Sequence, residues 1–247
     1  MFLPKYLHTF TGKFTGILLN IDDKILFQDI IPLNSGGSYK LLFDMFYHIR
    51  QLKYVRQSHL KQINPRYSKI CAINKLNKLV EKEFLENTYD DVYIATDKVL
   101  PKIKKNGYNI KLLPKESKGK GEINQLNNTE VFIQALNLPD YKTLLYPNFD
   151  YIEPDALLVR IKDNAYKLEF LEIEASKSNW PEWLENKRTN YLKLANDPQV
   201  YSYWKAHCTY LKLEAPDIKD FKFSVSIIGK IKKDFETGFN FIDNLNG

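Results

Sequence analysis

Three carboxylates between residues 152 and 177 are the side chains best suited to chemistry in this sequence. Asp155 follows Pro154, and Glu172 and Glu174 stand two residues apart in a run that is otherwise mostly apolar. Carboxylate oxygens suit Mg²⁺, a hard cation, and a bound metal activates water for attack on a phosphodiester. We therefore expect Asp155, Glu172 and Glu174 to bind Mg²⁺, with Mn²⁺ as a substitute, at a phosphodiester-cleaving site.

Two predicted strands must position these carboxylates. Residues 152–161 are expected to form a strand, residues 162–165 a turn, and residues 166–176 the antiparallel partner strand. Strict alternation puts Glu172 and Glu174 on the face of Leu168 and Phe170, while the other face is also apolar. The second strand is thus expected to be central and buried. Buried glutamates are costly without compensation, which either a cation or a structural cluster of salt bridges would supply.

A helix over residues 183–195 is expected to cover this sheet. At helical spacing, Leu184, Lys187, Tyr191 and Leu194 form one stripe. The stripe brings Lys187 into the row that faces the sheet, where its ammonium could stabilise the charge that develops on a phosphoryl group. Lys187 is therefore the fourth candidate catalytic residue, beside the three carboxylates.

Upstream, three helices followed by a hairpin predict a winged helix-turn-helix over residues 39–105. The first helix is expected at 38–52, with the apolar stripe Leu42, Met45, Phe46 and Ile49, and the second at 57–63. The third is expected at 65–83, with the stripe Ile70, Ile73, Leu76 and Val80. Two short strands are expected on either side of a polar turn at 86–91. A further helix is expected over 96–105. Such units read bases with the start of the third helix and hold phosphates with basic side chains. The candidate contacts to double-stranded DNA are Arg66, Tyr67, Ser68, Lys69, Lys75, Lys78 and Lys82.

Two other interpretations of this basic unit stay open. It could be a three-helix bundle with a solvated basic face, or a winged helix that contacts proteins. The formal charge of +6 and the pI of about 9.0 favour a polyanionic partner, but a charge of this size can also serve solubility.

The division of the chain follows from these patterns. Residues 1–37 are expected to form a β arm, 38–113 the winged helix-turn-helix domain, 114–128 a linker without apolar periodicity, and 129–247 an α/β domain. Two isolated cysteines, Cys71 and Cys208, favour a reduced, cytoplasmic chain. No apolar run reaches the length of a membrane span. No phosphate-binding or dinucleotide-binding glycine motif occurs, and a homodimer is left open.

The downstream motifs resemble a known superfamily. Pro154-Asp155, the Glu172-to-Glu174 strand and the lysine-bearing helix after it are similar to the PD-(D/E)XK nucleases. The order of winged helix, linker, acidic strand, Lys187 and Tyr191 resembles, more narrowly, the replication-relaxation family of plasmids and mobile elements. The resemblance implies an N-terminal winged helix followed by a mixed sheet flanked by helices, with Asp155, Glu172 and Glu174 as metal ligands.

The sequence departs from that pattern at one position. Glu174 stands where the superfamily usually has a lysine, so Lys187 or Lys177 would have to replace it. Glu130 resembles an acidic residue that some members add to the site, although a solvated glutamate favoured by the dipole near a helix N-terminus explains it better.

Three functions follow as expectations. The first is DNA binding in plasmid, phage or mobile-element replication or mobilisation, with Mg²⁺-dependent strand cleavage. The second is a non-catalytic DNA-binding regulator or replication initiator whose nuclease-like domain serves assembly. The third is a protein-interaction module in which the basic face is incidental.

Overall fold

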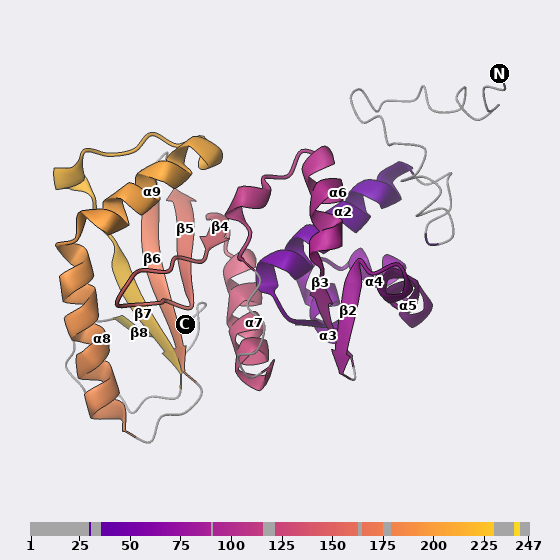
Figure 1. The fold of residues 1–247 in the computed structure, drawn as a ribbon, viewed down its shortest axis with the longest axis horizontal. Helices are drawn as coiled ribbons and strands as arrows, with labels where there is room; N and C mark the ends of the chain where they lie inside the picture. Colours follow the sequence, from indigo (N-terminus) through magenta and orange to yellow (C-terminus); the bar gives the residue numbers. More distant parts are fainter. Residues whose placement is uncertain are drawn as a thin grey trace.

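The computed structural model describes residues 30, 36–89, 91–115, 122–162, 165–174, 179–229 and 240–242 and has a mixed α+β architecture. A helical unit with a small sheet is followed by a five-stranded sheet with helices on both faces (Figure 1). The mixed α+β fold predicted from the sequence is thus confirmed. The predicted β arm over 1–37 lies outside the described residues, except for Ile30 and for Gly36 and Gly37, which begin the first described helix.

The first described helix, α2 (Gly36–Leu52), carries the apolar stripe that the sequence predicts. Its members recur at helical spacing and are fully buried, at 0% exposed: Leu42, Met45, Phe46 and Ile49. A short helix, α3 (Gln57–Ile63), follows at the predicted bounds.

The helix predicted over 65–83 is two helices in the structure, α4 (Tyr67–Ile70) and α5 (Ile73–Glu81). The chain leaves the helical conformation at Ala72, whose φ and ψ are −58° and 138°. The carbonyl of Cys71 accepts a hydrogen bond from Gln57 Nε2 at 3.1 Å, so a side chain of α3 supplies a donor that a continuous helix would supply from its own backbone.

This break changes which side chains of α5 are buried. Ile73 was expected in the apolar stripe but is 58% exposed, whereas Leu76 and Leu79 are fully buried. The predicted stripe therefore holds at Ile70 and Leu76, which are buried, and is wrong at Ile73, because helical periodicity extends only along an uninterrupted helix.

A three-stranded antiparallel sheet completes the helical unit. It consists of β1 (Val55–Arg56), β2 (Leu85–Tyr89) and β3 (Val92–Ala95), in the order β1-β3-β2. The β2–β3 hairpin is the expected pair of short strands after the basic helices, and β1 adds an unpredicted strand to its edge. The identification of this unit as a winged helix stays a prediction.

After the hairpin, a 3₁₀ turn η2 (Asp97–Val99) leads into α6 (Leu100–Lys105), and a second 3₁₀ turn, η3 (Ile110–Leu112), follows. Then α7 (Glu122–Leu136) begins inside the predicted linker of 114–128. Residues 122–128 are thus helical, which corrects that prediction. The helix packs into the interior of the protein, where its side chains Leu126 and Phe132 are buried.

The large sheet has the strand order β4-β5-β6-β7-β8. Its antiparallel half comprises β4 (Tyr141–Leu145), β5 (Ala156–Lys162) and β6 (Ala165–Glu174), and its parallel half adds β7 (Ser224–Gly229) and β8 (Asn240–Ile242) to β6. The predicted antiparallel hairpin of β5 and β6 is confirmed, with Ala156 opposite Leu171 and Lys162 opposite Ala165.

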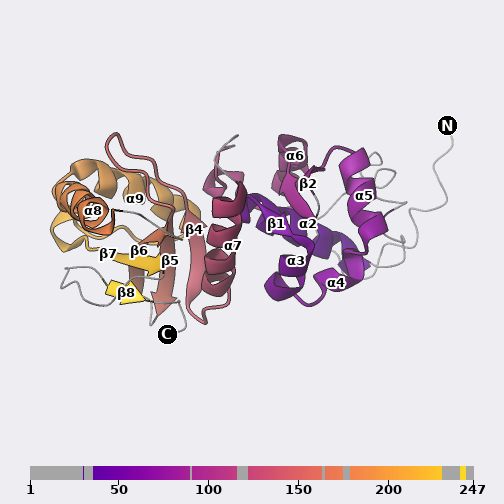
Figure 2. The same ribbon diagram turned by 90° about the horizontal axis from the view of Figure 1, so that it is seen from below.

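The two faces of this sheet are covered by different helices. Leu158 and Leu171 face the core shared with α7, and Leu157 and Phe170 face the core under α8 (Trp180–Ala195) and α9 (Pro198–Leu211). A 3₁₀ turn, η4 (Ile218–Asp220), leads from α9 towards β7. Figures 1 and 2 both show α7 between the sheet and the helical unit, with α8 and α9 on the far side.

One hydrophobic core runs from the helical unit through α7 into the sheet. It includes Phe46 of α2, Phe132 of α7 and Leu158 of β5. The two parts of the chain are therefore packed on each other through α7, and this packing brings residues far apart in the sequence to the same end of the sheet.

Candidate active site

Asp155 and Glu172 lie at the same end of the β5–β6 hairpin. The Asp155 N–H donates to the Leu171 carbonyl at 3.1 Å, which continues the strand pairing one residue beyond Ala156. Glu172 follows Leu171 on β6, so the backbone register itself places the two carboxylates beside each other.

Asp155 is held by two donors from different elements. Asn128 Nδ2 of α7 donates to Oδ1 at 3.0 Å, and the Ile173 backbone N–H of β6 donates to Oδ2 at 2.7 Å. Burial raises the pKa of Asp155, while the Ile173 N–H and the positive charge of Lys187 act in the opposite direction. The carboxylate is therefore fixed in orientation by the sheet and by α7.

Glu172 is held by two residues of α8. Lys187 Nζ donates to Oε2 at 2.6 Å, and the Tyr191 hydroxyl donates to Oε1 at 2.7 Å. The side chain is only 2% exposed. Burial raises the pKa of Glu172 to about 7, although Lys187 lowers it, and Asp155 adds to the rise.

The helical stripe that the sequence predicts on α8 is confirmed. Leu184, Tyr191 and Leu194 are buried, the last two in the core on this face of the sheet, and the Lys187 side chain is 19% exposed. Lys187 Nζ also lies 5.6 Å from the centre of the Trp183 ring. We call Asp155, Glu172, Lys187, Tyr191 and Asn128 the carboxylate site.

The other two acidic candidates, Glu174 and Glu130, are not members of the carboxylate site. Glu174 has the strand parity of Glu172 and is half-buried. The Glu130 carboxylate turns towards the helical unit, where Oε1 lies 2.8 Å from Nε2 of the buried His59 on α3. Lys177 lies outside the described residues.

The carboxylate site fits a magnesium ion that is held by two carboxylates, with water and phosphate as its other ligands. Within the described part of the chain, no three His, Cys, Asp or Glu side chains are grouped closely enough to hold a metal ion, so Glu174 does not complete the predicted set of three carboxylate ligands. Mg²⁺ is commonly bound by one or two carboxylates, with water and substrate phosphate as its other ligands. Asp155 and Glu172 suit that form, since each carboxylate oxygen keeps a lone pair beyond its single hydrogen bond described above.

The predicted DNA contacts divide into exposed and buried side chains. Tyr67 is 0% exposed and its hydroxyl is hydrogen-bonded with His48 Nδ1 at 2.7 Å, so its predicted position on a DNA-contacting surface is wrong. Lys75 is half-buried, and its Nζ donates to the Lys69 carbonyl at 3.1 Å. The exposed members of the set are Arg66, Ser68, Lys69, Lys78 and Lys82.

Asn128 is the member of the carboxylate site that the sequence did not predict. Its position in the predicted linker gave it no helical context, and its side chain reaches Asp155 only because α7 packs on the sheet. Tyr191 lay on the predicted stripe, but only the fold shows that its hydroxyl binds Glu172.

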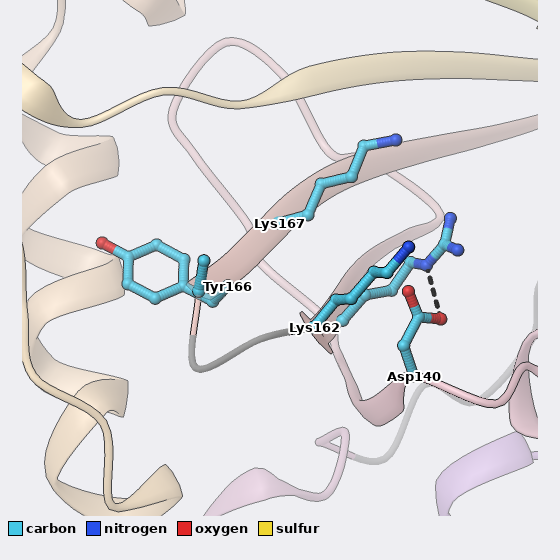
Figure 3. A pocket seen from close by; sticks show the side chains of 6 residues that line it. Asp140, Lys162, Tyr166 and Lys167 are labelled. Carbon is cyan, nitrogen blue, oxygen red and sulfur yellow. Dashed lines mark hydrogen bonds and ion pairs between the residues drawn. The ribbon is translucent and has the colours of Figure 1, made fainter.

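A separate surface hollow of about 240 Å³ lies at the opposite end of the β5–β6 hairpin. Figure 3 shows Asp140, Lys162 and Lys167 in its lining. The Nε atom of Arg160, which also lines the hollow, donates to Asp140 Oδ1 at 2.9 Å. It contains no member of the carboxylate site.

No protein-family model matches the chain, and no curated protein matches it. Among solved structures, restriction endonuclease FokI is similar with 9% sequence identity and a TM-score of 0.26, over 80% of this chain and 38% of that one. In the described residues, no helix is both long and apolar enough to cross a membrane.

Proposed function

We propose that the protein binds double-stranded DNA and cleaves it at the carboxylate site in a Mg²⁺-dependent reaction. The observation that carries the proposal is Glu172, a 2%-exposed carboxylate held by Lys187 at 2.6 Å beside Asp155. A buried acid with a perturbed pKa and a specific charged partner is typical of functional sites. Its pKa of about 7 is also far from the ordinary value for a glutamate.

The residues of the site have separate proposed roles. Asp155 and Glu172 would hold Mg²⁺, which when bound supplies Lewis-acid stabilisation and an activated water. Asn128 and the Ile173 N–H orient Asp155, and Tyr191 orients Glu172. Such partners of metal-binding groups fix their geometry and tune their basicity.

Lys187 is proposed to bind a phosphate oxygen of the substrate. An ammonium group has three donors, and one of them goes to Glu172. Lys187 would then provide the positive charge that the resembled superfamily usually carries at the position of Glu174. The resemblance alone suggests that the DNA belongs to a plasmid, phage or mobile element during replication or mobilisation. The two isolated cysteines favour action in the cytoplasm.

The helical unit is proposed to hold the DNA. The exposed basic side chains of the predicted contact set, Arg66, Lys69, Lys78 and Lys82, lie on and beside α4 and α5, which come just before the β2–β3 hairpin. Lysine and arginine contacts to phosphates release counterions, so affinity would fall with rising salt concentration.

One observation favours a second function, that of a DNA-binding regulator or initiator without catalysis. Each oxygen of Asp155 and Glu172 already accepts a hydrogen bond from the protein, and Lys187 is engaged by Glu172. A cluster satisfied in this way can be purely structural, because paired buried charges need no ligand.

Incubation with supercoiled plasmid and Mg²⁺ or Mn²⁺ separates the two functions. A nuclease nicks the plasmid, and Asp155→Asn and Glu172→Gln abolish nicking while retaining DNA binding in a gel-shift assay. Glu169→Gln is the matched control, because Glu169 is also buried on β6 but its side chain binds Ser226 on the other face of the sheet. DNA binding by the wild type with no nicking in either metal would establish the regulator instead.

A further inference from the structure

The backbone at Lys53 has an unusual conformation. Its φ is 69°, in the left-handed region that disfavours residues with a side chain. Tyr54 N–H donates to the Leu52 carbonyl at 2.9 Å, two residues back, so Lys53 is the central residue of a three-residue turn. A turn of this kind with positive φ at its centre is rare and strained.

The other two residues with positive φ have an ordinary explanation. After Glu83 and Lys212, the next N–H reaches back five residues into the helix that has just ended, from Phe84 to Leu79 and from Leu213 to Cys208. That is a common way for a helix to end. The Tyr54 N–H, by contrast, bonds to the Leu52 carbonyl only two residues back. The positive φ of Lys53 therefore belongs to a three-residue turn and not to a helix end of the common kind.

Buried side chains hold this turn in place. The Thr129 hydroxyl of α7, which is 0% exposed, donates to the Tyr54 carbonyl at 2.5 Å. The Tyr146 hydroxyl donates to the carbonyl of Gln51, whose own side chain donates to Tyr141 at 3.0 Å. Strained backbone persists where its surroundings determine it, and such positions cluster at functional sites.

The turn directs Lys53 towards the carboxylate site. Lys53 Nζ lies 4.6 Å from the centre of the Tyr146 ring, and Tyr146 follows β4 at the level where Leu145 pairs with Leu157, two residues after Asp155. Asn128, which binds Asp155, adjoins Thr129, which holds the turn. Burial raises the pKa of Asp155, and the charge of Lys53 is among the weaker influences that oppose this rise.

We propose that Lys53 is a phosphate-binding residue of the carboxylate site, supplied by the helical unit to contact the DNA backbone next to Asp155. This inference rests on the proposed function. Glycine would adopt a φ of 69° without strain, whereas lysine brings a positive charge to the junction between the helical unit and the sheet. Lys53 thereby links the unit that is proposed to hold DNA to the residues that are proposed to cleave it.

Lys53→Gly and Lys53→Arg test this role. Lys53→Gly removes the charge and relieves the turn, so its melting temperature should not fall below that of the wild type. Lys53→Arg keeps the charge. Lys205→Gln is the matched control, since Lys205 also lies near a tyrosine ring, at 6.0 Å from that of Tyr201, but on α9.

The first readout is the salt dependence of binding to a short duplex, which does not require cleavage. Loss of one phosphate contact should reduce the log–log slope by about 0.9 in Lys53→Gly. Lys53→Arg and Lys205→Gln should keep the slope of the wild type. A Lys53→Gly protein that is folded and has the slope of the wild type would overturn the proposal.

The second readout, plasmid nicking, separates this proposal from the proposed function. If the wild type binds DNA through Lys53 but never nicks it, the nuclease function fails and the phosphate contact stands. If the wild type nicks DNA and Lys53→Gly keeps both slope and rate, only the role of Lys53 fails. A flat salt dependence of the wild type would overturn both.

Discussion

Lys187 of α8 and Glu172 of β6 form an ion pair at 2.6 Å that joins the helix to the sheet inside the carboxylate site. The glutamate is 2% exposed and the lysine 19%, so little water reaches the pair. A carboxylate in this setting depends on its partner, because unpaired buried charge is strongly disfavoured.

Replacing Lys187 with methionine should therefore destabilise the fold. We expect a loss of about 3–5 kcal/mol in the free energy of unfolding at a pH where Glu172 is ionised. The loss should be smaller below the pKa of Glu172, which is about 7, because a protonated Glu172 needs no cation. Urea unfolding at two pH values measures both effects. Arg188→Met is the control, since Arg188 is half-exposed and forms only a 3.8 Å pair with Glu185. Equal losses in the two variants would contradict the role given to the pair.

Tyr191→Phe should remove one hydrogen bond to Glu172 and leave the ring in place. We expect a loss of roughly 1–3 kcal/mol, since the bond is made to a buried carboxylate. Tyr201→Phe provides the comparison, because its hydroxyl donates to the Pro216 carbonyl at 2.9 Å in a neutral hydrogen bond. Thermal or urea unfolding measures the two losses. A smaller loss at Tyr191 than at Tyr201 would show that the hydroxyl of Tyr191 matters little to Glu172.

The stability of the helical unit should depend on pH through His48. Burial lowers the pKa of His48 from 6.5 to about 4. Between these values the unfolded chain binds more protons than the folded one, so stability is lost as the pH falls through this window. The shift corresponds to roughly 3 kcal/mol at most.

The variant His48→Gln removes this titration. The difference in unfolding free energy between wild type and variant should therefore shrink as the pH is lowered from about 7 to about 4. Urea titrations across this range measure it. A difference that stays constant would show that His48 is not buried in its neutral form.

Lys78→Gln should weaken DNA binding in a salt-dependent way. Lys78 is exposed on α5, and the loss of one phosphate contact should lower the log–log slope by about 0.9. Lys219→Gln is the control, because Lys219 lies in η4 beyond the sheet and is paired with Asp217 at 3.6 Å. Identical slopes for the wild type and Lys78→Gln would remove α5 from the proposed DNA-binding surface.

The sequence predicted those features that depend on local periodicity. The β5–β6 hairpin, the pairing of its strands and the α8 stripe with Lys187 all follow from alternation or from helical spacing. The position of Asp155 beside Glu172 also follows, because an antiparallel register determines it.

Features that depend on tertiary contacts were not predictable in this way. The third helix is broken at Ala72, where Gln57 of another helix binds the Cys71 carbonyl. Asn128 reaches Asp155 only because α7 packs on the sheet. The approach of Lys53 to the same site depends on the buried Thr129, 76 positions later in the numbering of the chain. No short-range pattern carries such information.

The central claim is that the carboxylate site cleaves DNA, and the rate of Mg²⁺-dependent plasmid nicking tests it most directly. We expect the rate to fall roughly 100-fold or more in Asp155→Asn, since even the partners of metal-binding groups cost about 10- to 100-fold when removed. Glu169→Gln should nick at the rate of the wild type. Nicking that survives Asp155→Asn unchanged, or a wild type that binds DNA and never nicks it, would contradict the claim.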